Sequence, residues 1–85
     1  METRVALISM IVQDQESALE INALLHAYRQ YIIGRVGIPY APKKISIISI
    51  AIDAPQDIIS ALSGKLGALR GVSAKTVYSK VEGAN

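Results

Sequence analysis

Two segments of this sequence are apolar on both faces of a β-strand, and this feature constrains the fold more than any other. The segments are residues 4–12 and 45–52. Successive side chains of a strand point to opposite sides of a sheet, so a strand with one wet face alternates apolar and polar residues. Because both segments are apolar in both positions of that alternation, we expect both faces of the central sheet to be covered.

The length of the chain limits how much of this cover it can supply itself. Its 85 residues predict one domain over residues 1–85. A domain of this size hides only about 60–65% of the surface that its unfolded chain exposes, yet 51% of the residues are hydrophobic. The sequence has room for two helices, which cover one sheet face. We therefore expect a homo-oligomer, a dimer or a tetramer, in which another copy covers the second face.

Helical spacing of apolar residues predicts a first helix over about residues 14–32. Asp14 can cap its N-terminus, and Gly34 is expected to end it. The segment 34–40 that follows contains two glycines and Pro39. Proline lacks a backbone donor and glycine weakens a strand. We therefore predict an edge strand there, followed by a loop over residues 41–44.

A second helix is predicted between the strand over residues 45–53 and a last strand over residues 72–79. Asp53 can cap this helix, and Pro55 suits its first turn. Gly71 is expected as the glycine that follows its C-terminus. The tail over residues 81–85 is expected to fray.

The predicted order of elements, β-α-β-β-α-β, is that of a ferredoxin-like fold, an α+β sandwich. Its four-stranded antiparallel sheet has the order 4-1-3-2, with two helices on one face. In this order the first and third strands are central, and these are the two strands that are apolar on both sides. The second and fourth strands are then the edges.

The two faces of the central strands differ in one respect, which is the position of the serines. One alternation of each strand is purely apolar, and we assign it to the helix-covered core. The other alternation contains a serine, and we assign it to a face that a partner subunit covers. These predicted interface residues are Val5, Leu7, Ser9, Ile11, Ile45, Ile47, Ser49 and Ala51.

No pattern in the sequence predicts a catalytic site, a metal site or a cofactor. The chain has no cysteine, and His26 is its one histidine, so a histidine or thiolate metal site would need ligands from other chains. Helical geometry places His26 opposite the apolar stripe of its helix, where a surface histidine is the ordinary interpretation. The glycines and serines do not have the spacing of a phosphate-binding loop.

One cluster of residues could hold a small anionic effector. Arg35, Tyr40, Lys43 and Lys44 lie close in sequence around the predicted edge strand and its loop. They could bind a carboxylate or another anion, and a solvated loop is the alternative interpretation. The net charge of +2 is small and scattered, and without Phe or Trp an RNA-binding sheet is not expected. We therefore expect no direct nucleic-acid binding by this chain alone.

Neither a signal peptide nor a membrane-spanning segment is expected. Met1 is followed by a strand-like run rather than by a signal sequence with a cleavage site. The apolar runs are much shorter than the roughly 20 residues that cross a bilayer. These features predict a cytoplasmic location.

Four stretches of the sequence resemble the small regulators of the iron-only hydrogenase system. They are residues 34–40, 45–53, 59–67 and 71–78, and the resemblance covers nearly the whole chain. That family is similar to the C-terminal domain of the nickel-responsive repressor and to ACT domains. The resemblance implies a ferredoxin-like fold, homo-oligomers and a regulatory role in bacteria. The DNA-reading segment and the nickel ligands of that repressor have no match here.

Several functions remain open at this point. The first is a non-enzymatic regulatory or ligand-sensing module linked by resemblance to the iron-only hydrogenase system, with transcription regulation as the implied role. A protein-interaction adaptor is an alternative. A small enzyme of the dimeric α+β barrel kind would need polar residues between sheet and helices, where only apolar ones are predicted. Binding of DNA through basic loops of an oligomer is the fourth.

Overall fold

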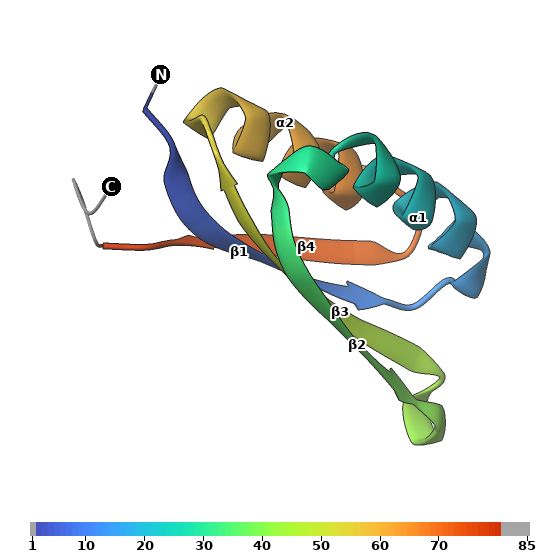
Figure 1. Ribbon diagram of the computed structural model, residues 1–85. Coiled ribbons are helices and arrows are strands. Elements are labelled where there is room, and N and C mark those ends of the chain that lie inside the picture. Colours follow the sequence, from blue (N-terminus) through green and yellow to red (C-terminus); the bar gives the residue numbers. More distant parts are fainter. Residues whose placement is uncertain (1, 81–85) are drawn as a thin grey trace.

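The computed structural model describes residues 2–80 and has an α+β architecture, with a four-stranded antiparallel sheet and two α-helices (Figure 1). The predicted fraying of residues 81–85 lies outside the described residues. The strands and helices are, in chain order, β1 (Arg4–Val12), α1 (Ala18–Ala27), β2 (Ile32–Tyr40), β3 (Ile45–Ala54), α2 (Gln56–Gly67) and β4 (Val72–Tyr78). Three short 3₁₀ turns, Gln15–Ser17, Arg29–Tyr31 and Ala41–Lys43, lie between them.

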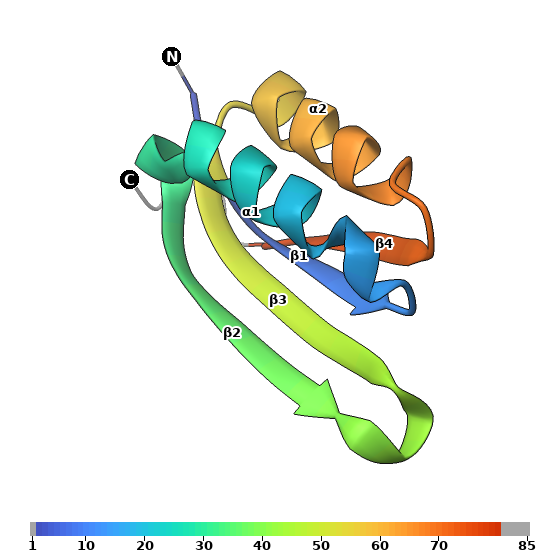
Figure 2. The same ribbon diagram turned by 90° about the vertical axis from the view of Figure 1, so that its right-hand side faces the viewer.

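The strands lie in the order β2-β3-β1-β4, and named from the β4 edge the same sheet reads β4-β1-β3-β2. Every neighbouring pair is antiparallel. The structure confirms that β1 and β3 are central and that β2 and β4 are edges. Both helices lie on the same side of the sheet (Figures 1 and 2). Within residues 2–80, the sheet therefore has one helix-covered face and one open face.

The core lies between the helices and the covered face, and its residues are those of the purely apolar alternation. The buried sheet residues are Ala6, Ile8, Met10, Val12, Ile50, Ile52 and Ala54 of the central strands and Val72 of β4. The helices contribute Ile21, Leu25, Ile59, Leu62 and Leu66. Ile48 belongs to the same alternation but is only half-buried. It lies toward the β2–β3 hairpin, whose tip projects away from the helices (Figure 1).

The first helix is shorter than predicted. It ends at Ala27 rather than near residue 32, and Gly34 lies within β2 instead of ending a helix. The Arg29 guanidinium donates to the carbonyl of His26 at 2.9 Å, which satisfies an acceptor at the helix end. The β-branched Ile32 then begins the strand, as its preference for extended backbone favours. Helical spacing alone could not separate this turn from a further turn of helix.

The second helix begins and ends differently from the prediction. Asp53 lies in β3, and the residue before the helix is Pro55. The carbonyl of Pro55 accepts from the backbone N–H groups of Ile58 and Ile59, at 3.0 and 3.1 Å. Helix α2 ends at Gly67, four residues before Gly71. Gly71 has the predicted left-handed conformation, with φ +68, but it forms the turn into β4 rather than the helix end.

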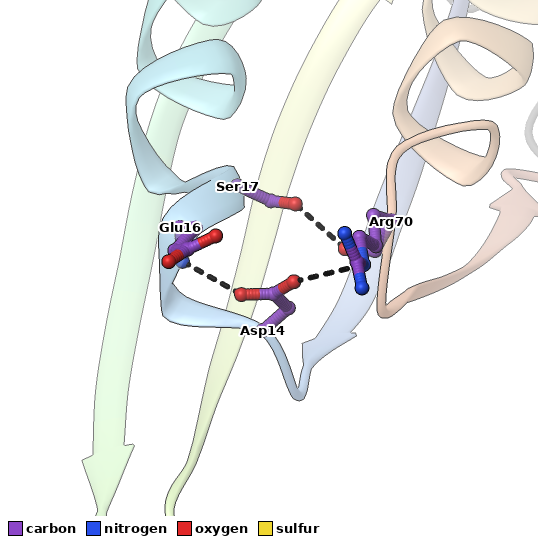
Figure 3. A network of polar contacts seen from close by, with 4 residues as sticks. All are labelled: Asp14, Glu16, Ser17 and Arg70. Atoms are coloured by element: carbon purple, nitrogen blue, oxygen red, sulfur yellow. Dashed lines mark hydrogen bonds and ion pairs between the residues drawn. The ribbon is translucent and has the colours of Figure 1, made fainter.

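A polar network joins the two connections at one end of the domain (Figure 3). Asp14 accepts from the backbone N–H of Glu16 at 2.9 Å, so it caps the 3₁₀ turn that precedes α1. Its other carboxylate oxygen lies 3.5 Å from Arg70 Nε. The Ser17 hydroxyl donates to the carbonyl of Arg70 at 2.6 Å. These contacts fix the β1–α1 connection against the α2–β4 connection.

Candidate functional site

The open face of the sheet carries most of the exposed apolar surface. Among residues 2–80, ten large hydrophobic side chains are exposed, and eight of them share this face by strand register. Their exposed fractions range from 39% for Ile47 to 64% for Val77. The eight residues are Val5, Leu7, Ile11, Val36, Ile38, Tyr40, Ile47 and Val77. Such a concentration on one face is typical of an interaction surface rather than of scattered surface residues.

A short polar row crosses the middle of this apolar face. Ser9 of β1 is paired directly with Ser49 of β3, and their hydroxyl oxygens lie 3.0 Å apart. On the other side, Ser9 is paired with Lys75 of β4. Asp53 lies on the same face, opposite Val5. The open face is thus apolar with a satisfied hydroxyl pair at its centre and one residue of each charge.

The structure places all eight predicted interface residues on the open face. Val5, Leu7, Ser9, Ile11 and Ile47 are exposed, and Ile45, Ser49 and Ala51 are half-buried. Sequence reasoning missed the contribution of the edge strands, which add Val36, Ile38 and Tyr40 from β2 and Val77 from β4. The alternation within each edge strand was visible. Its assignment to a face required the pairing register.

The four residues predicted to bind an anion are not brought together. Arg35 is paired with Ile50, so its side chain lies on the helix side of the sheet, where its Nη2 donates to Asn22 Oδ1 at 3.3 Å. Tyr40 is paired with Ile45 and lies on the open face. Lys43 and Lys44 lie in the turn between β2 and β3 and are exposed. A single site made of all four is therefore not formed within one chain.

The described residues show three further features of the chain. His26 is exposed on α1, as predicted. No three of the His, Cys, Asp and Glu side chains in residues 2–80 come together as metal ligands would. Within the same range, neither helix has the length and apolar content needed to cross a membrane.

The comparisons with known proteins agree with this architecture. The chain belongs to the TM1266-like family, whose description is "Iron-only hydrogenase system regulator, putative" and whose model matches residues 4–76. The resemblance noted in the sequence is thereby confirmed. No curated protein shows significant similarity to the chain.

One solved structure is similar over nearly the full length. It is that of the uncharacterized protein TM1266 from Thermotoga maritima, which is 40% identical in sequence. The match covers 93% of this chain and 100% of that chain, with a TM-score of 0.87. The arrangement of strands and helices is therefore shared with that protein.

Proposed function

We propose that this protein is a non-enzymatic regulatory module of an iron-only hydrogenase system, and that it acts as a homo-oligomer formed through the open face of its sheet. The family description supports the regulatory part of this proposal. The β-α-β-β-α-β order and the central position of β1 and β3 support a ferredoxin-like, ACT-like arrangement. A small-molecule effector would act by favouring one state of assembly over another.

The observation that carries the proposal is the set of eight exposed apolar side chains on the open face. Fully burying such a side chain stabilises a protein by about 1.5–3 kcal/mol, and these are roughly half covered already. Covering them on two copies would contribute roughly 12–24 kcal/mol, against an association cost of about 4–15 kcal/mol. The central values of these two ranges favour assembly.

The charges on the open face support a second copy as the occupant. Asp53 and Lys75 both lie on this face and both are exposed. In a two-fold interface a residue of one copy meets a different residue of the other, and the same contact occurs twice. Opposite charges on one self-complementary face suit such a pairing, since each copy supplies both partners.

The layer between helices and sheet supports a non-enzymatic role. An enzyme of the dimeric α+β barrel kind would place its polar groups in a cavity there. In this chain the layer is filled by buried apolar residues such as Ile8, Met10, Ile50 and Leu62. An adaptor that binds a different protein through the open face is the remaining alternative, and it is distinguished by the oligomeric state of the isolated protein.

The test is made in a host that encodes an iron-only hydrogenase, after deletion of the gene for this protein. Transcripts or activity of the hydrogenase should change, and the wild-type protein should restore them. Leu19→Glu is the matched control, because Leu19 lies on α1 and is 82% exposed. It should restore function, whereas Leu7→Glu on the open face should not. Unchanged hydrogenase transcripts and activity in the deletion strain would contradict the regulatory role.

A further inference from the structure

A pocket lies on the helix side of the sheet, on the opposite side from the open face. It has a volume of about 420 Å³ and is formed where the second half of α1 approaches the start of β2. This volume is in the lower part of the range of small-molecule sites. The lining residues are Asn22, Leu25, His26, Arg29, Ile32 and Arg35.

The local structure explains why these side chains converge. Leu25 and His26 lie three and four residues after Asn22, and Arg29 lies four and three residues after them, which places all four on one side of α1 and its following turn. A β-bulge in β2 supplies the remaining part. Its register shifts between Ile32 and Gly34, so that Ile32 and Arg35 face the same side although they are three residues apart. Bulges commonly redirect a side chain next to a site.

The floor and the rim of the pocket differ in polarity. Leu25 is buried at 3% exposure and Ile32 is half-buried, and these two side chains supply the apolar floor. The rim carries the guanidinium groups of Arg29 and Arg35, the imidazole of His26 and the amide of Asn22. No acidic residue of the described range 2–80 lines the pocket.

Among residues 2–80, Arg29 and Arg35 have no anionic partner, whereas Arg70 pairs with Asp14. Arg29 and Arg35 hydrogen-bond to neutral oxygens, the carbonyl of His26 and Oδ1 of Asn22. Within residues 2–80 no carboxylate lies within ion-pair distance of either guanidinium. Each guanidinium has five N–H donors and uses one in these bonds, so donors remain for a ligand.

We propose that this pocket binds a small organic anion, a carboxylate or a phosphate ester. Its charged group would lie between the guanidiniums of Arg29 and Arg35, where planar, forked donors match the oxygens of such groups. Its apolar part would lie over Leu25 and Ile32. His26 and Asn22 complete the rim with further hydrogen-bonding groups.

This pocket would be the effector site of the proposed regulatory function. Its role as an effector site rests on that proposed function, whereas the binding of an anion can be tested without it. Arg35 and Val36 are neighbours on β2 and lie on opposite faces of the sheet. A ligand that holds Arg35 therefore acts on the strand that also presents Val36 and Ile38 to the open face. Strand β2 would in this way connect binding in the pocket to assembly through the open face.

The test is titration of the full chain with phenyl phosphate and with succinate, followed by amide NMR shifts and calorimetry. We expect saturable binding by at least one of the two, with the shifts centred on Asn22, His26 and Arg35. Benzyl alcohol, which has the ring but no charge, should not bind. Absence of saturable binding by both anions would overturn the proposal.

Charge variants separate this pocket from general attraction of anions. Arg29→Gln and Arg35→Gln should each weaken binding at least about tenfold, since each removes charge-assisted hydrogen bonds. Lys43→Gln is the matched control, because it removes one positive charge from the exposed β2–β3 turn. Equal weakening in all three variants would overturn the proposed site.

The same titration distinguishes failure of this site from failure of the proposed function. Leu7→Glu changes the open face and leaves the pocket residues unchanged. If the pocket binds anions independently of assembly, this variant should bind with an unchanged Kd even where it no longer assembles. Loss of binding in Leu7→Glu with retained fold would contradict a site contained within one chain.

Discussion

The hydroxyl oxygens of Ser9 and Ser49 lie 3.0 Å apart, on residues that are paired directly across β1 and β3. The pair lies in the middle of an otherwise apolar face that the chain leaves open. In water such a bond contributes little, because each hydroxyl could bind solvent instead. Beneath a second copy, the bond would satisfy two hydroxyls that water could no longer reach.

This difference predicts an energetic coupling between the two serines. Ser9→Ala in a covered face leaves the Ser49 hydroxyl without a partner, at a cost of about 1–3 kcal/mol. The double variant Ser9→Ala/Ser49→Ala should recover much of that loss, because no hydroxyl remains unpaired. The measurement is urea denaturation of the four proteins at one protein concentration, since the stability of an oligomer depends on concentration. Additive effects of the two substitutions would indicate a face that stays wet.

Ser17→Ala should destabilise the protein. Ser17 is the buried polar side chain of the described core, at 2% exposure, and its hydroxyl donates to the carbonyl of Arg70 at 2.6 Å. The alanine leaves this carbonyl without its donor, which should lower the free energy of unfolding by about 1–3 kcal/mol. Ser60→Ala, at an exposed position of α2, is the control and should change it by less than about 0.5 kcal/mol. Equal effects of the two changes would contradict the role given to the Ser17 bond.

Alanine substitutions at two glycines should change the stability of the protein in opposite directions. Gly71 has φ +68, and a Cβ there would lie 2.7 Å from Asp14 Cβ and 2.9 Å from its backbone nitrogen. Gly71→Ala should therefore destabilise the protein by more than about 1–2 kcal/mol. Gly64 lies within α2, and a Cβ there meets no atom within 4 Å. Gly64→Ala should stabilise the protein by about 0.5–1 kcal/mol. Thermal unfolding of both variants and the wild type measures these changes. A change of stability in the same direction for both variants would contradict this account of Gly71.

The sequence predicted the sheet better than the helix ends. The apolar residues on both faces of β1 and β3, among them Ile8 and Ile50, showed that these strands are central, because a strand with two covered faces belongs in the middle of a sheet. The end of α1 was missed because Tyr31 and Ile32 pack against the core from a 3₁₀ turn and a strand. Helical spacing does not distinguish these conformations. Asp53 was taken for a cap because local preference takes no account of the ladder that extends β3 to Ala54.

The candidate sites, too, were predicted only in part from the sequence. The serine-bearing alternation identified the open face of the central strands, since side-chain direction has a period of two in any strand. Of the residues that line the proposed anion site, Arg35 was the one predicted from the sequence to bind an anion. Arg35 and Tyr40 are five residues apart in β2, so the alternation of the strand places them on opposite faces, and the bulge at Ile32 and Gly34 brings Arg35 to the same side as Ile32. No local pattern reveals a one-residue shift of register, although the spacing of Asn22, His26 and Arg29 by four and three residues was visible in the sequence.

The central claim is that a second copy of the chain covers the open face, and sedimentation velocity of the purified protein tests it most directly. At micromolar concentration we predict a species of at least twice the 9.1 kDa chain mass. Leu7→Glu should shift this species toward the single chain, and Leu19→Glu should leave it unchanged. A folded wild-type protein that sediments as one 9.1 kDa chain at every concentration would contradict the account.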